Sequence, residues 1–213
     1  SATNGLGVYN VGASTITANN ITIDGTTSLA PNWATFIGTL TINSGSAGGN
    51  IAVTGNVINT PGGAGGIYQS GTITTRSGSN ISFTSNNDIN QLGAIAMAAN
   101  TSASAASITY DTTTGNKTSS IVGGALTIGT SSSSSAINYT MLSAGSAINP
   151  GAIGTSSVAL PGTVTLDNTY GAASGGSKAS GYITASVANR LVDLATTSIG
   201  VTINSAIFAS GNI

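Results

Sequence analysis

Branched aliphatic residues recur along this chain at a nearly constant interval, and this period constrains the fold more than any other feature. One series, spaced by 30, 30, 27, 29 and 27 residues, comprises Ile21, Ile51, Ile81, Ile108, Ile137 and Val164. A second series, spaced by 27, 28, 26, 32 and 30 residues, comprises Leu40, Ile67, Ile95, Ile121, Ile153 and Ile183. A fixed spacing of this kind indicates a repeat architecture, here with a unit of about 28 residues.

Each unit contains short runs in which apolar and polar residues alternate. In residues 80–84, Ile81 and Phe83 face one side of an extended chain while the polar residues face the other side. Residues 85–88, Ser-Asn-Asn-Asp, follow directly, and these residue types favour turns because their side chains hydrogen-bond the nearby backbone. The pattern therefore predicts a half-buried strand that ends in a corner.

A unit of this size with two or three short strands cannot bury its own apolar face, so it needs neighbours above and below. We therefore expect an all-β parallel β-solenoid of about 28 residues per turn, in which equivalent strands stack about 4.8 Å apart. Inward aliphatic residues would form ladders, as would asparagine amides at the corners. The alternative is an antiparallel β-sandwich, which predicts hairpin turns; Asp24-Gly25 is the one clear hairpin signal.

The last part of the chain departs from this pattern. We expect solenoid repeats over residues 1–185 and a less regular flank over residues 186–213. Within the flank, Val187, Leu191 and Leu194 have helical spacing, which predicts a short helix over residues 186–196. Residues 201–208 again have the alternation of a strand.

Charge is scarce: the chain has 4 basic and 5 acidic residues and neither His nor Cys. Nucleic acids and anionic membrane surfaces require clustered Lys and Arg, so neither is an expected partner. No apolar run approaches the length of a membrane-spanning helix, so membrane insertion is not expected. No basic start followed by an apolar core indicates a signal peptide. We expect the mature, exported part of an extracellular protein.

Residues suited to catalysis or metal binding are equally scarce. Glycosidases need a pair of carboxylates, and Asp88 and Asp111 are the best candidates, 23 residues apart; turn residues are the favoured interpretation of both. Zinc requires His or Cys, and the Gly-rich residues 61–66 lack both the Asp of a calcium repeat and the Lys of a phosphate-binding loop. We expect no enzyme and assign no catalytic, cofactor-binding or metal-binding residue.

Aromatic residues and Thr-X-Thr triplets could still contact a ligand. Trp33 and the six tyrosines could stack on sugars if exposed, although Tyr110 and Tyr139, 29 residues apart, are expected to form a stacked pair on adjacent turns. The triplets begin at residues 15, 39, 72 and 163, in no single phase of the repeat. Regular threonine arrays are similar to those of ice-binding β-solenoids, but outward strand positions are the favoured interpretation.

The repeats at residues 49–57 (Gly-Asn-Ile-Ala-Val-Thr-Gly-Asn-Val) and 79–84 (Ser-Asn-Ile-Ser-Phe-Thr) resemble those of filamentous-haemagglutinin-like and autotransporter passenger proteins of bacterial surfaces. The resemblance covers about residues 14–167 and implies a right-handed β-helix. The Asn-Pro-Asn motif of the family's secretion domain has only Asn-Pro-Gly at residues 149–151 as a counterpart. The secretion route of the family is therefore not carried over.

The resemblance implies a non-enzymatic extracellular protein, a structural or adhesive segment of a bacterial surface adhesin or fibre. The alternative is a self-assembling subunit of a filament, sheath or surface layer, and a carbohydrate-binding or carbohydrate-cleaving β-helix is less favoured. Expected partners are other copies of the chain, flanking repeats of a longer chain and surface glycans. No cofactor is expected.

Overall fold

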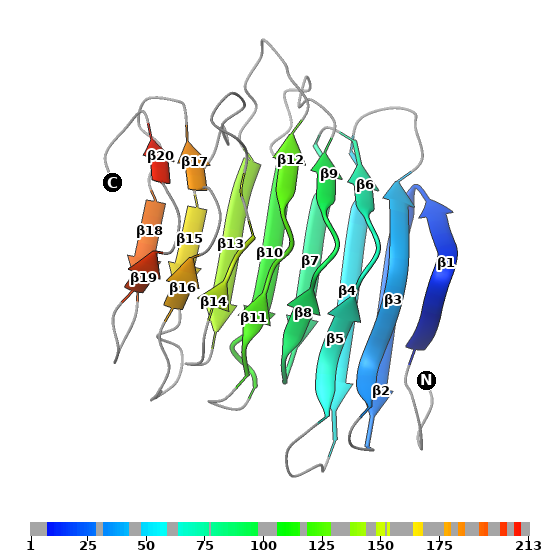
Figure 1. Ribbon diagram of the computed structural model, residues 1–213. Coiled ribbons are helices and arrows are strands. Elements are labelled where there is room, and N and C mark those ends of the chain that lie inside the picture. Colours follow the sequence, from blue (N-terminus) through cyan, green and yellow to red (C-terminus); the bar gives the residue numbers. More distant parts are fainter. Residues whose placement is uncertain are drawn as a thin grey trace.

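The computed structural model describes parts of the chain from Val8 to Ala209 and is all-β in these parts, with no helix. The described residues are 8–28, 32–42, 48–58, 64–76, 78–97, 106–115, 119–128, 137–143, 148–151, 153, 164–167, 177–179, 183–185, 192–195, 201–203 and 207–209. The strands stack side by side along one axis, with β1 and β20 at opposite ends of the stack (Figure 1).

One side of the stack is a seven-stranded sheet to which each coil contributes one strand. Its strands, in spatial order, are β2 (Asn20–Thr27), β4 (Asn50–Val57), β7 (Asn80–Ser85), β10 (Ala106–Thr112), β13 (Ile137–Ser143), β15 (Val164–Asp167) and β18 (Val192–Ala195).

An eleven-stranded sheet, in which the long strand β3 (Trp33–Ile42) is shared by two rows, forms the other side. The start of β3 pairs with the first row, which comprises β5 (Gly65–Gln69), β8 (Ile89–Gln91), β11 (Ile121–Val122), β14 (Ile148–Asn149), β16 (Ser177–Ala179) and β19 (Val201–Ile203). The end of β3 pairs with the second row, which comprises β6 (Ile73–Thr75), β9 (Ile95–Met97) and β12 (Leu126–Ile128). Strand β1 (Val8–Ala18) lies beside β3, and β17 (Ile183–Ala185) pairs with β20 (Ile207–Ala209).

Every pairing between described strands is parallel, and consecutive strands of the chain lie in different rows. Parallel strands need crossover connections rather than hairpins, so the alternative of an antiparallel sandwich is wrong. The β-solenoid is confirmed.

The first aliphatic series is largely one column of the core. Ile21 pairs with Ile51, Ile51 with Ile81, and Ile81 with Ile108, and each side chain is at most 4 % exposed. Full burial of such a side chain contributes about 1.5–3 kcal/mol. Ile137 was wrongly placed in this series: it pairs with Ala106, while Tyr139 pairs with Ile108. The error arises because the coils differ in length. An average spacing then selects Ile137, whereas Tyr139, the next inward position of the same strand, is the true member of the column.

The second aliphatic series mixes two columns. Leu40, Ile95 and Ile153 belong to the row that contains β6, β9 and β12, in which Ile95 pairs with Leu126 and Leu126 bridges Ile153. Ile67 and Ile121 instead belong to the row of β5, β8 and β11 and flank Ile89. Both columns are fully buried. Hydrophobicity marks a residue as inward but does not show to which of the two rows it belongs.

The expected C-terminal helix is not found in the described part of residues 186–196. Val192–Ala195 is strand β18, which pairs with β15 through Val164↔Val192 and Leu166↔Leu194. Residues 186–191 and 196 lie outside the described residues. The helical spacing of Leu191 and Leu194 was misleading because an alternating strand also places apolar residues at Val192 and Leu194.

Candidate functional site

The two carboxylates considered for catalysis have separate hydrogen-bond partners. Asp88 Oδ1 accepts hydrogen bonds from the Ser120 backbone N–H at 2.7 Å and from the Ser120 hydroxyl at 3.0 Å. Asp111 Oδ1 accepts one from the Thr113 backbone N–H at 2.8 Å. Both therefore act as corner or turn residues, which is the favoured interpretation. Among the described residues, no three His, Cys, Asp or Glu side chains gather in a group that could hold a metal ion.

The corner after β7 binds the preceding coil. The Asn86 side chain forms two bonds with Val57: its Oδ1 accepts from the Val57 N–H at 2.8 Å, and its Nδ2 donates to the Val57 carbonyl at 2.9 Å. Asn87 Nδ2 donates to the Ala64 carbonyl at 2.7 Å. The Asn-rich corner that the sequence predicts thus connects two coils through side-chain amides.

An exposed ladder of polar side chains runs along the start of the seven-stranded sheet. Asn50 N–H donates to Asn20 Oδ1 at 3.0 Å, Asn80 Nδ2 donates to Asn50 Oδ1 at 3.2 Å, and the Ser107 hydroxyl donates to Asn80 Oδ1 at 2.9 Å. Equivalent residues of successive coils therefore bind one another. Asparagine amides therefore stack as expected, but at the first residues of β2, β4 and β7 and not in the corners between strands.

A second polar chain lies inside the coil and was not expected. Gln69 and Gln91 are fully buried. Gln69 Nε2 donates to the Gly38 carbonyl at 2.9 Å, and Gln91 Nε2 donates to Gln69 Oε1 at 2.9 Å. Gln91 Oε1 in turn accepts from the Tyr110 hydroxyl and from the Gly124 N–H, each at 2.8 Å. The two amides therefore link four successive coils through the core.

Tyr110 and Tyr139 pack against each other in the core on the adjacent strands β10 and β13, as the sequence predicts, but their ring planes are tilted by 49° and not stacked. Their ring centroids are 5.6 Å apart, and the Phe83 ring stacks on Tyr110 with its centroid at 5.0 Å. Burial raises the pKa of the Tyr110 hydroxyl well above its ordinary value, partly offset by a hydrogen bond with Tyr139. Burial, the nearby Tyr110 charge and this hydrogen bond raise the pKa of Tyr139. Both phenols are therefore neutral at physiological pH.

Glycines stack where the chain bends between the two rows of the eleven-stranded sheet. A Cβ at Gly93 would lie 1.7 Å from the Gly71 carbonyl oxygen, and one at Gly124 would lie 2.0 Å from the Gly93 carbonyl oxygen. These distances leave no room for a side chain, so the coils can approach only because glycine occupies the bend. This column is not apparent from the hydrophobic pattern of the sequence, although Gly71 and Gly93 each follow an inward glutamine by two residues.

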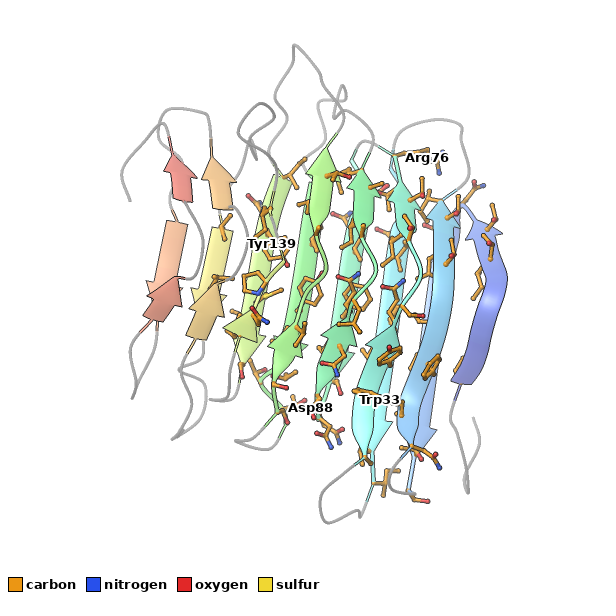
Figure 2. The ribbon with its side chains drawn as sticks, in the orientation of Figure 1. Trp33, Arg76, Asp88 and Tyr139 are labelled. Atoms are coloured by element: carbon orange, nitrogen blue, oxygen red, sulfur yellow. The ribbon has the colours of Figure 1, made fainter. Side chains whose placement is uncertain are left out.

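The aromatic side chains that the structure describes fall into two groups. Phe83, Tyr110 and Tyr139 are fully buried, whereas Trp33, Phe36 and Tyr68 are only partly buried. The Tyr68 ring centroid lies 4.6 Å from that of Phe36 and 5.3 Å from that of Trp33. Figure 2 labels Trp33 near the start of β3, beside β5. We call Trp33, Phe36 and Tyr68 the aromatic cluster.

Three of the four threonine triplets lie on adjacent strands. Thr15 and Thr17 of β1 pair with Thr39 and Thr41 of β3, and Thr41 pairs with Thr74 of β6. These threonines are exposed or partly exposed, so the outward interpretation is confirmed for them. Thr165 lies in the other sheet. The triplets are neighbours despite their unequal spacing in the sequence, because the strand register and not the sequence distance decides which residues lie side by side.

Within the described part of the chain, no helix has the length and apolar character needed to cross a bilayer.

The parallel pairings and buried columns establish the β-solenoid, and the family resemblance of residues 49–57 and 79–84 stays an expectation. Comparisons of the chain with protein-family models, curated proteins and solved structures find no match.

Proposed function

We propose that this chain is a non-enzymatic structural and adhesive segment of an extracellular bacterial protein, whose work is to extend a stiff surface away from the cell. The observation that carries the proposal is the continuity of side-chain bonding between coils. Asn50 and Asn80 outside the coil, and Gln69 and Gln91 inside it, each bind the coil before them. Backbone ladders with such side-chain links favour a mechanical role.

The surface supports the same role. It has few charges, with 4 % of the chain charged, and it presents the asparagine ladder and the threonine triplets instead. Hydroxyl and amide side chains keep the rod hydrated without the charge clusters that would attract nucleic acid. The proposed partners are flanking repeats, other copies of the chain and surface glycans.

Negative-stain microscopy and immunogold labelling test this proposal. We expect purified protein to appear as short straight rods, and antibodies against it to label intact cells of the source organism. Label that appears only after permeabilisation would contradict the extracellular role. Flexible or globular particles would contradict the role as a stiff spacer.

A subunit of a filament, sheath or surface layer is the second candidate. Strand β2 lies at the edge of the described seven-stranded sheet, and its inward Ile21 and Ile23 pair with Ile51 and Val53 of β4 on one side only. A sheet edge of this kind can pair with another strand. Long fibres that grow with protein concentration would favour this candidate over the spacer, whereas turnover of a glycan would contradict both.

A further inference from the structure

We infer that the aromatic cluster of Trp33, Phe36 and Tyr68 is a binding site for a neutral sugar, which packs a pyranose ring against the exposed parts of these side chains. The inference rests on the adhesive role proposed above and goes further by naming the contact surface. The three rings form one continuous group, with Tyr68 between the other two at 4.6 and 5.3 Å.

Among the aromatic side chains that the structure describes, those of the cluster alone are partly exposed. The other aromatic side chains that the structure describes, Phe83, Tyr110 and Tyr139, are fully buried. The rest of the described outer surface consists mainly of Ser, Thr, Asn and Gly with scattered aliphatic residues. Partly exposed rings that gather at one place, on a chain with 5 % aromatic residues, provide an apolar patch amid groups suited to hydroxyls.

Polar groups suited to sugar hydroxyls flank the rings. Asn90 is the register partner of Tyr68 on the next strand, and both are partly exposed. Asn32 directly precedes Trp33. Within the described contacts, neither the Asn32 nor the Asn90 side-chain amide has a hydrogen-bond partner in the protein. An amide can both donate to and accept from a hydroxyl, so each end of the cluster has a group that can fix the orientation of a sugar.

The scaffold holds the cluster in place before any ligand binds. A Cβ at Gly65 would lie 2.1 Å from Trp33 Cε3, so the indole packs directly against a glycine backbone. Gly65 N–H also donates to the Asn32 carbonyl at 3.2 Å, and Phe36 and Tyr68 are register partners on β3 and β5. A site on paired strands loses little conformational entropy on binding.

The size of the cluster favours a small ligand over a protein. Three partly exposed rings offer on the order of 100 Å² of apolar surface, whereas a stable protein interface buries about 800 Å² on each partner. The cluster itself contains no charged side chain, so it has no group that selects an anionic ligand. A neutral sugar of one or two rings matches both the area and the chemistry.

Trp33 provides a direct probe because it is the only tryptophan in the chain. We would screen the full chain against an array of neutral hexose oligosaccharides, with sulfated and sialylated glycans as the anionic arm. Hits would be titrated by Trp33 fluorescence at low and high salt. The inference predicts binding to a neutral oligosaccharide, a shift of the Trp33 emission and an affinity that does not change with salt, because no ion pair forms.

Matched variants then locate the site. Tyr68→Ala is expected to weaken binding about fivefold or more, since it removes the central ring, whereas Tyr68→Phe keeps the ring and is expected to retain binding. Leu92→Ala is the control, because Leu92 is 50 % exposed and lies outside the cluster, and its affinity is expected to equal that of the wild type. Circular dichroism would establish that each variant retains the fold.

Several outcomes would overturn the inference. These are no binding of any neutral oligosaccharide at millimolar concentration, binding that Tyr68→Ala leaves unchanged, salt-dependent binding of anionic glycans alone, or an oligomer that Tyr68→Ala dissociates without any sugar. The rods and the surface labelling would be unaffected by any of these results. Failure of this site is therefore distinguishable from failure of the proposed structural role.

Discussion

The Tyr110 hydroxyl donates a hydrogen bond of 2.8 Å to Gln91 Oε1 in the fully buried core, across from one sheet to the other. Gln91 also binds Gln69 and the Gly124 N–H, so one amide joins both sheets and several coils. A buried polar group that lacks its partner is costly, and a shifted register would separate these partners. The amide therefore stabilises one alignment of the coils against its alternatives.

Substitutions at Gln91 and Tyr110 are predicted to differ in severity. Gln91→Met keeps a similar volume but leaves Gln69 Oε1, the Tyr110 hydroxyl and the Gly124 N–H without their partner, so the free energy of unfolding is expected to fall by about 3–5 kcal/mol. Tyr110→Phe leaves Gln91 Oε1 bound to Gly124 and is expected to cost about 1 kcal/mol. Urea denaturation measures both. Equal losses in the two variants would contradict the central position of Gln91.

Alkaline pH is predicted to destabilise the protein through its buried phenols. Burial raises the folded-state pKa of Tyr110 and of Tyr139 above the ordinary value, which is about 10 in an unfolded chain. The contribution of each neutral, buried phenol to the free energy of unfolding is therefore fully present below about pH 10. This contribution is lost as the pH rises from about 10 towards the folded-state pKa. In that window each buried tyrosine lowers the stability by about 1.4 kcal/mol per pH unit.

Urea denaturation at several pH values between 8 and 12 would measure this dependence. Tyr110→Phe removes one of the two groups, so the loss of stability per pH unit above about pH 10 is expected to be roughly half that of the wild type. The plateau below this pH serves as the internal control. The same slope in both proteins would show that Tyr110 ionises freely in the folded state.

Gly93 is predicted to tolerate no side chain. Its Cβ would lie 1.7 Å from the Gly71 carbonyl oxygen, which belongs to the backbone and cannot rotate away. Gly93→Ala must therefore separate two coils, and we expect a loss of about 3 kcal/mol or more in the free energy of unfolding. Leu92→Ala, next to it and 50 % exposed, is the control and should change stability by about 0.5 kcal/mol or less. Similar melting curves for both variants would contradict this.

The inward column of the seven-stranded sheet was predictable from the sequence because its signal is local. Ile51, Ile81 and Ile108 alternate with polar residues and recur at a near-constant interval, so both the inward face and the stacking followed. The misplacement of Ile137 shows the limit of this signal: two inward positions of one strand are equivalent in hydrophobicity. The register of β13 on β10 places Tyr139 beside Ile108. This pairing is a tertiary contact, which the local pattern of the sequence does not contain.

The interior polar chain could not be predicted in this way, because a glutamine at an inward position contradicts the hydrophobic pattern. Gln69 and Gln91 are buried only because Gly38, Tyr110 and Gly124 supply partners from other coils. The aromatic cluster was also not assembled from the sequence. Trp33 and Tyr68 are far apart along the chain, and the pairing of β3 with β5 that brings them together is a tertiary contact.

Asn86 is predicted to be the most important of the described corner amides. It replaces a strand neighbour for Val57 by accepting from its N–H at 2.8 Å and donating to its carbonyl at 2.9 Å. Asn86→Ala leaves both backbone groups without this partner, so we expect a loss of about 1–3 kcal/mol. Asn86→Asp keeps the acceptor for the Val57 N–H but places a carboxylate oxygen against the Val57 carbonyl oxygen, so it should also be destabilising. Asn50→Ala is the matched control, because Asn50 is exposed and water can replace its hydrogen bonds. Urea denaturation measures the loss in both variants. A larger loss in Asn50→Ala than in Asn86→Ala would show that the corner does not depend on the Val57 contact.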